Sequence, residues 1–431
     1  MNPSITRPTE DVRVIVFGSQ DVMGSAVSDT DSTRTSWTLQ LCKLLGCTSY
    51  LSLVPSADEA PGLISNAMYQ TVIHEFLSSL EETEILQAPA SDYQFLNKQY
   101  PVPSDTPDLA VQVQQFLSLS PQDIRSRSTI WVFTFGTWDV WNLAALPQAI
   151  ASDALEDMAT HIFEQVELLY LKALNPRSIA FSEFWVHVAD SDMKKLMAPT
   201  ASEIIDERAL ENFRIIIPKL LDITLAPVWL ARQKPTYPHT IAQQLRNAVA
   251  LTRLWNKKIE EKIEEWQKKG RSRPMGLELE GILSASNFPS SDAELEGFAS
   301  KLPTETKQQN GQFDLIVAPY PKRIGSLFPV AEPDIMDAMR EAEMQRGKLG
   351  DSAGSDGRVV NNSMLFKNAW TPCFESTMKF PGKEERQTVI SCDELDGYLF
   401  YDESTLNQRA INHISSMTAN YVLRQLFPPQ R

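Results

Sequence analysis

The sequence has few of the residues that metal, phosphate and nucleophilic sites use most often. Its 431 residues include five histidines, four cysteines and 17 glycines. The glycines never form G-x-G-x-x-G or G-x-x-x-x-G-K, which excludes the two common phosphate-binding loops. Asp29 and Asp31 have no His or further carboxylate at metal-ligand spacing, so helix capping explains them better than a metal does. We therefore expect no metal and no cofactor.

Positive charge and long apolar runs are also scarce. Lys and Arg total 40 against 55 Asp and Glu, a formal net charge of −15. Because phosphate binding needs clustered cations, this balance argues against nucleic acid as a partner. The longest apolar candidate, 213–231, is interrupted by Lys219 and Asp222, so no transmembrane helix is predicted. We expect an apolar small-molecule substrate, and the sequence identifies no partner protein.

The N-terminal segment MNPSITRPTEDVRV is polar and acidic and lacks the apolar stretch of a secretory signal. We therefore predict a cytoplasmic protein. In a reducing compartment, cysteines without Cys-x-x-Cys spacing are expected to be free thiols, mostly buried. This expectation covers Cys42, Cys47, Cys373 and Cys392.

Apolar, β-branched runs alternate with helical patterns along the chain. Segment 12–18 predicts a buried strand, 28–46 a helix that Asp31 or Ser32 caps and Gly46 ends, and 48–54 a second strand. Strand, helix and strand in this order form a βαβ unit. Further strands are predicted at 128–136, 177–188 and 313–320, and a long, partly exposed helix at 242–270.

This alternation predicts an α/β fold: a three-layer αβα sandwich with a doubly wound, mostly parallel sheet. We expect a single domain over 10–431 with helical and loop insertions near 284–312 and 340–390. The segment 343–358 is rich in Gly, Ser and charge and is predicted to be a loop.

Ligands of open α/β sheets bind outside the carboxyl ends of the strands, so the residues that follow each strand are the informative ones. GSQD follows the first strand at 18–21, and GTWDVW follows the strand at 128–136. Near the C-terminus, DEST at 402–405 precedes the final helix. We predict that these three motifs line one site.

The three motifs together resemble those of the SGNH or GDSL hydrolase family. Its first motif is Gly-Asp-Ser after strand one, a later one is Gly-x-Asn-Asp, and the last is Asp-x-x-His before the terminal helix. The corresponding residues here are Gly18-Ser19-Gln20, Gly136 to Asp139, and Asp402 to Thr405, with a weaker match near 63–70 at Ser65 and Asn66. The resemblance implies a three-layer αβα fold and ester hydrolysis.

The departures from the family pattern fall on the catalytic positions. Gln20 replaces the serine, Trp138 the asparagine and Thr405 the histidine, whereas Asp402 matches the family's aspartate. An esterase of this kind needs a hydroxyl nucleophile and an imidazole base. A register shift would make Ser19 the nucleophile but supplies no base, because His413 lies eight residues beyond Thr405, about 12 Å along a helix.

A site that lacks both the serine nucleophile and the imidazole base suits a reaction in which the protein transfers no proton. We predict a non-hydrolytic enzyme, a cyclase of the Diels–Alder type, in which the Gln20 amide donates to a substrate carbonyl. The analogy is with fungal natural-product pathways that recruit disabled enzyme folds as Diels–Alder catalysts, including one that forms a norbornene ring. The predicted substrate-binding residues are Asn66, Gly136, Trp138, Asp139 and Trp141.

Two other functions stay open: an esterase that uses Ser19, and a noncatalytic binding protein whose tryptophans fill the pocket. Trp138 and Trp141 are then core residues, and Asp139 and Asp402 are helix caps.

Overall fold

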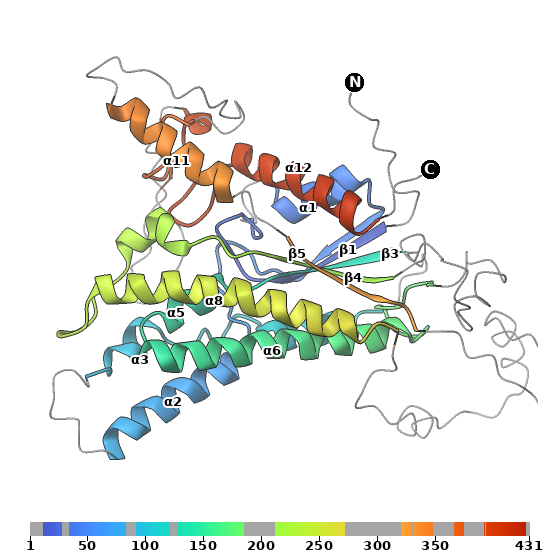
Figure 1. Cartoon of the computed structure of the whole chain (residues 1–431), viewed down its shortest axis with the longest axis horizontal. Coiled ribbons are helices and arrows are strands. Elements are labelled where there is room, and N and C mark those ends of the chain that lie inside the picture. The colour runs from blue at the N-terminus through green and yellow to red at the C-terminus, as the bar shows by residue number, and fades with distance from the viewer. Residues whose placement is uncertain are drawn as a thin grey trace, which may run out of the picture.

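The computed structural model has a five-stranded, all-parallel sheet with helices on both faces (Figure 1). It describes residues 12–27, 34–82, 92–120, 128–184, 212–271, 320–328, 332–347, 366–374, 392 and 394–427. The strand order is β2-β1-β3-β4-β5. The strands are β1 (Val12–Gly18), β2 (Ser49–Ser52), β3 (Ser128–Thr134), β4 (Phe213–Pro218) and β5 (Arg323–Phe328).

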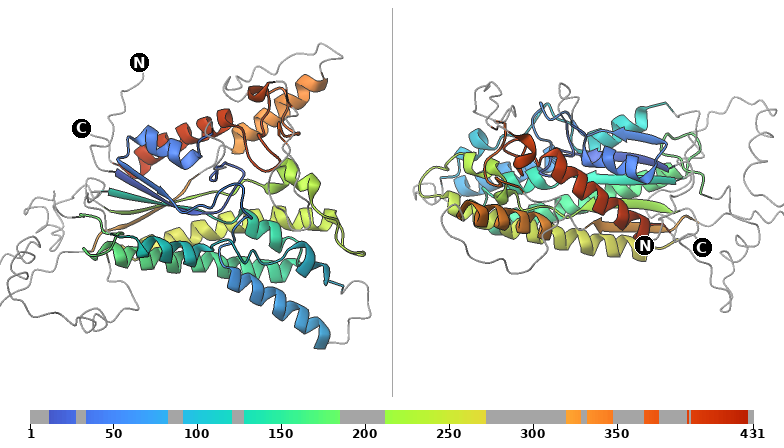
Figure 2. Two further views of the ribbon diagram at one scale, coloured as in Figure 1. Left: turned by 180° about the vertical axis from the view of Figure 1, so that it is seen from behind. Right: turned by 90° about the horizontal axis from the view of Figure 1, so that it is seen from above.

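Helices form a layer on each side of this sheet, which gives three layers (Figure 1). On one side, α1 (Trp37–Leu45) lies beside α12 (Gln408–Gln425), as Figure 2 also shows. On the other side, α6 (Gln148–Ala173) packs along α8 (Ile241–Lys268). The other α-helices are α2 (Asn66–Glu82), α3 (Phe95–Gln99), α4 (Leu109–Ser118), α5 (Thr137–Leu143) and α11 (Glu332–Gly347). Short 3₁₀ turns cover Ile223–Leu225, Pro227–Ala231 and Leu395–Gly397.

The central strands are buried because helices cover both faces of the sheet. Every residue of β1, β3 and β4 is buried, as expected of parallel strands with near-continuous apolar sequences. β1 and β3 pair in register from Val12 opposite Ser128 to Gly18 opposite Thr134. Both strands therefore end at the same edge of the sheet, and their following turns begin side by side.

The predicted α/β fold and several of its elements are confirmed. The strands predicted at 12–18, 48–54 and 128–136 correspond to β1, β2 and β3, and the helix predicted at 242–270 is α8. The helix predicted at 28–46 begins only at Trp37, where the Ser36 hydroxyl accepts from the N–H of Leu39. It ends as predicted at Gly46, which has a left-handed conformation. The predicted caps Asp31 and Ser32 lie outside the described residues.

The strand predicted at 177–188 is wrong over its described part, 177–184. Consecutive turns occur there, with Ser178 N donating to Asn175 O and Phe181 N to Ser178 O. The buried Arg13 side chain takes up the carbonyl oxygens of residues 179–181, so these carbonyls are used by a side chain and not by a neighbouring strand. Residues 185–188 lie outside the described part of the chain, as do 313–319 of the other predicted strand.

Two strands, β4 and β5, were not predicted. The predicted loop at 343–358 is wrong over its first residues, because α11 continues to Gly347; residues 348–358 lie outside the description. The predicted insertion at 284–312 also lies outside it, and the one at 340–390 is described only at 340–347 and 366–374.

The prediction of free thiols is wrong. Cys42 is bonded to Cys47, with Cα atoms 5.1 Å apart, and Cys373 to Cys392, with Cα atoms 5.0 Å apart. Both separations fall within the usual range for disulfides. Disulfides persist mainly in oxidising compartments, so these two bonds give no support to the predicted cytoplasmic location. Among the described helices, none has the length and apolar character needed to cross a membrane.

Candidate functional site

The structure brings the three predicted motifs to the carboxyl edge of the sheet. The turn after β1 and the turn after β3 begin next to each other, because Gly18 pairs with Thr134. The 402–406 loop reaches the first turn, where the N–H of Leu406 donates to the carbonyl of Val22 (2.9 Å). The motifs are therefore neighbours, although they are separated by more than a hundred residues along the chain.

Gly18 is required where β1 ends. A Cβ atom at this position would collide with the side chain of Thr134 on the neighbouring strand. The Gln112 side chain of α4 accepts from the Gly18 N–H (2.9 Å) and donates to the Gly18 carbonyl (2.8 Å). Two hydrogen bonds from one buried amide thus fix where the first motif begins.

Gln20 is buried, and its amide group holds the loop that follows β2. The Nε2 atom donates to the carbonyl of Ser56 (3.1 Å) and to that of Glu59 (2.9 Å), which uses both of its hydrogens. Among the described residues, the Oε1 atom has no partner. In this conformation Gln20 organises residues 56–59, and its predicted role as a donor to a substrate stays a prediction.

Ser19 is buried, and its hydroxyl has no hydrogen-bond partner within the described chain. Gly62 lies next to both Ser19 and Thr106, because a Cβ on Gly62 would stand 3.7 Å from the Ser19 Oγ and 3.2 Å from the Thr106 Cγ2. Ser19 thus faces the segment just before α2, where the weaker second motif was predicted.

Three of the described histidines have partners outside the three motifs. The Nε2 of His413 pairs with Asp334 (2.8 Å) and the Nδ1 of His161 with Glu164 (3.0 Å). His239 packs against the ring of Tyr93. His74 is on α2, and His187 lies outside the described residues. No described histidine forms a hydrogen bond with Ser19 or Asp402, so neither of these two residues has a histidine partner in the described chain.

Asp402 shapes the last motif. Its Oδ1 accepts from the N–H groups of Ser404 (2.8 Å) and Thr405 (2.7 Å), and from the Ser404 hydroxyl (3.0 Å). The Thr405 hydroxyl lies 3.3 Å from that of Ser404. Asp402 does not cap the final helix, because Asn407 has that position and accepts from the N–H of Ala410.

Gly136 and Asp139 connect the β3–α5 turn to its surroundings. Gly136 has φ +115°, a conformation that favours glycine, and a Cβ there would lie 2.9 Å from the Trp255 ring. The Oδ1 of Asp139 accepts from the N–H of Ile64 (2.9 Å). Burial raises the pKa of Asp139 to about 7, against the opposing effect of nearby backbone N–H groups. Asp139 is thus a buried carboxyl that titrates near neutral pH.

A cavity of about 230 Å³ lies beside these motifs at the carboxyl edge. Trp138 and Trp141 of α5 form one wall, and the segment 99–106 and residues 60 and 61 form others. The side-chain amide of Asn66 donates to the carbonyls of Pro103 and Thr106, both of which line the cavity. Ser19 and Gln20 are not among the lining residues. The two predicted tryptophans therefore line a real cavity, and Asn66 supports its rim.

Arg232, in the segment after β4, completes the cavity wall. Its guanidinium lies over the rings of Tyr100, Trp141 and Trp229, 4.4–4.7 Å from the ring centres. The Nε donates to the Oε1 of Gln244 (2.7 Å), whereas Nη1 and Nη2 have no hydrogen-bond partner in the described chain. Burial lowers the pKa of Arg232 to about 10, so the group stays positively charged at neutral pH.

Sequence reasoning missed Arg232 and Trp229 because β4 was not recognised. The segment 213–231 was treated as one apolar run interrupted by charges, not as a strand followed by an edge segment. Part of the signal was present: FRIIIP is a short run with three isoleucines and predicts a strand. The segment after it would then lie at the carboxyl edge, but nothing in the sequence singles out Arg232, fourteen residues beyond Pro218.

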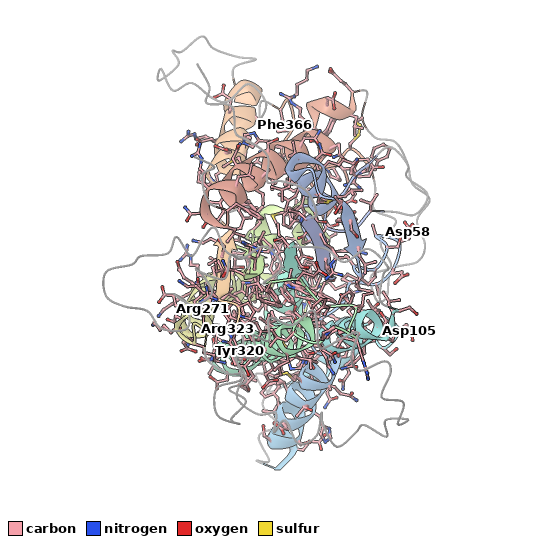
Figure 3. The ribbon with its side chains drawn as sticks, turned by 90° about the vertical axis from the view of Figure 1, so that its right-hand side faces the viewer. Asp58, Asp105, Arg271, Tyr320, Arg323 and Phe366 are labelled. Atoms are coloured by element: carbon pink, nitrogen blue, oxygen red, sulfur yellow. A yellow bond between two sulfur atoms is a disulfide. The ribbon has the colours of Figure 1, made fainter. Side chains whose placement is uncertain are left out.

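Charged groups at the opposite, amino-terminal edge have structural partners. Arg271, Tyr320 and Arg323 lie together there (Figure 3). Arg323 forms an ion pair with Glu167 of α6 (2.7 Å), and Arg271 donates to the Tyr320 carbonyl (3.0 Å). These contacts join the start of β5 to the helices.

A comparison of the sequence with protein-family models and with curated proteins finds no match. The structural likeness rests on topology: a parallel sheet of order 2-1-3-4-5 with helices on both faces is consistent with an SGNH-like α/β fold.

Proposed function

We propose that this protein is a non-hydrolytic enzyme on an SGNH-like fold, which binds an apolar, carbonyl-bearing small molecule in the Trp138–Trp141 cavity and folds it for a pericyclic cyclisation. The observation that carries the proposal is this cavity, apolar on most sides, next to motifs without a serine–histidine pair among the described residues. Pockets with mostly apolar walls and a few polar groups are typical small-molecule sites.

A Diels–Alder cyclisation needs no group of the protein to gain or lose a proton. Three π bonds of the diene and dienophile become two new σ bonds and one π bond, and every atom of the substrate is retained. The protein contributes by holding the reacting carbons near each other, which can lower a barrier by several kcal/mol. Flat indole faces such as those of Trp138 and Trp141 suit the positioning of a polyene.

Gln20 acts in this proposal as a positioning residue. Its amide hydrogens hold the carbonyls of Ser56 and Glu59, and the same loop continues into Ala60 and Pro61, which line the cavity. Donation to a substrate carbonyl, the role suggested by the sequence, would require one of these hydrogen bonds to be exchanged.

The test is the incubation of purified protein with linear trienes that carry a tethered enone, followed by chiral chromatography of the cyclised products. We expect a faster reaction and an excess of one stereoisomer. Trp138→Phe should reduce both, whereas Trp370→Ala, which removes an exposed tryptophan outside the cavity, should not. Melting curves of both variants control for folding.

Two results would replace the proposal. Labelling of Ser19 by a fluorophosphonate probe, with turnover of aryl esters, would show an esterase with a base that the described residues do not supply. Binding of the trienes without acceleration would show a noncatalytic binding protein.

A further inference from the structure

Arg232 is a buried cation that has no anionic partner among the described residues. Four buried arginines are described, and the other three have acceptors for their terminal nitrogens. Arg323 pairs with Glu167, Arg214 donates to Ser128, and Arg13 donates to backbone carbonyls. Among the described residues, the Arg232 side chain forms one hydrogen bond, that of Nε to Gln244.

In the described part of the chain, aromatic rings surround the Arg232 guanidinium, and no carboxylate pairs with it. Its electrostatic neighbours are the phenol groups of Tyr100 and Tyr69, and within the described chain no Asp or Glu forms an ion pair with it. Cation–π contacts offset part of the cost of burying a charge. They leave the N–H groups of Nη1 and Nη2 without acceptors from the described residues. Buried donors without acceptors destabilise a fold.

Arg232 lines the cavity together with Trp138 and Trp141, and its Nη1 and Nη2 atoms are covered in this conformation. We propose that the cavity binds an organic oxyanion, a carboxylate on an otherwise apolar molecule. Its oxygens accept from Nη1 and Nη2 once the Arg232 guanidinium turns toward the cavity, while its apolar body lies against the two tryptophans. This inference rests on the function proposed for the cavity and adds the charge of its ligand. Guanidinium and carboxylate match in a two-point geometry.

Asp105 is the acidic residue of the cavity lining, and it does not oppose this assignment. It is exposed, it accepts from the Ser104 hydroxyl (3.2 Å), and it lies at the outer surface in Figure 3. Solvent and salt screen an exposed charge far more than a buried one. The buried guanidinium therefore dominates the selection by charge.

The test compares cinnamate with cinnamamide, two probes of nearly equal shape that differ in charge, by calorimetry on the full chain at neutral pH. We expect cinnamate to bind at least tenfold more tightly than the amide. Arg232→Gln should remove this preference, and Arg232→Lys should retain part of it. Arg246→Gln, which removes the same charge from an exposed position of α8, should leave it unchanged.

The outcomes distinguish the contact of a ligand carboxylate with Arg232, here called the anchor, from the proposed enzymatic function. Equal affinity for the two probes, or no binding of either while trienes still cyclise, would overturn the anchor alone. Selective binding of cinnamate without any acceleration of trienes would support the anchor and overturn the enzyme. If Arg232→Gln does not fold, the preference for cinnamate over cinnamamide is compared between wild type and Arg232→Lys. A smaller preference in the lysine variant would support the anchor. An undiminished preference in that variant would overturn two-point recognition by Arg232.

Discussion

Asp139 should make the stability of this protein depend on pH near neutrality. It is buried at the start of α5, where its Oδ1 accepts from the N–H of Ile64. Burial raises its pKa from 3.8 to about 7. Replacement by asparagine keeps a side-chain oxygen for the Ile64 N–H and removes the titration. The difference between Asp139→Asn and wild type therefore measures the effect of protonation of Asp139 on stability.

The sign follows from the direction of the shift. Between about pH 4 and pH 7, the folded state holds a proton that the unfolded chain has released. The stability that this carboxyl contributes is fully present below its unfolded pKa and is lost as the pH rises through its folded pKa. A shift of three units, at about 1.4 kcal/mol per unit, amounts to about 4 kcal/mol. About 2 to 3 kcal/mol of this is lost between pH 5 and pH 7.

Urea unfolding of both proteins at half-unit steps from pH 5 to pH 8 measures this effect. The free energy of unfolding of Asp139→Asn should gain about 2 to 3 kcal/mol relative to wild type between pH 5 and pH 7 and then stay level. Other titrating groups, such as Asp21 with a pKa of about 6, are common to both proteins and cancel. In the control Asp21→Asn, the corresponding gain should end about one unit earlier. A difference between Asp139→Asn and wild type that does not change with pH would refute the reasoning.

Three further predictions follow from the geometry. Gly136→Ala should lower the free energy of unfolding by about 2 to 4 kcal/mol in urea, because φ is +115° and a Cβ would lie 2.9 Å from Trp255; a loss below about 0.5 kcal/mol would contradict this. Denatured, unreduced protein should not react with a thiol reagent, and reduction should release four thiols per chain. Loss of the Cys373–Cys392 bond should lower the free energy of unfolding by about 3 kcal/mol in a thermal or urea melt. Gln20→Ser should not hydrolyse aryl esters or react with a fluorophosphonate, because neither Ser19 nor Gln20 has a hydrogen bond with a described histidine; turnover would show that a base is present.

The elements that could be predicted are those whose own sequence has a clear hydrophobic pattern. β1 and β3 are continuous apolar runs that end near glycines, and α8 has a 28-residue amphipathic pattern. β5 has no such pattern, since it begins with Arg323 and contains Gly325 and Ser326. Its buried arginine is satisfied by Glu167, 156 residues earlier in the chain, and a contact over that distance is not visible in a local pattern.

The meeting of the three motifs could be predicted from the sequence, but the contacts of their side chains could not. Parallel strands place their following turns at one edge, and the three motifs do meet there. The tertiary contacts decide what each side chain does. The Gln20 amide is directed to Ser56 and Glu59, and the Asp402 carboxylate to its own loop. These partners lie in loops whose sequences do not indicate a contact.

The position of the cavity bears on which function is chemically possible. Ser19 lies next to Gly62, and Thr106 rather than Ser19 lines the cavity. The Ser19 hydroxyl is covered in this conformation, so a ligand in the cavity contacts Trp138 and not Ser19. Hydrolysis would need a movement that uncovers this hydroxyl and an imidazole base as well, whereas binding of an anionic, apolar molecule needs only a turn of the Arg232 guanidinium. For this reason a photoreactive cinnamate analogue should label the cavity walls and leave the turn after β1 unmodified.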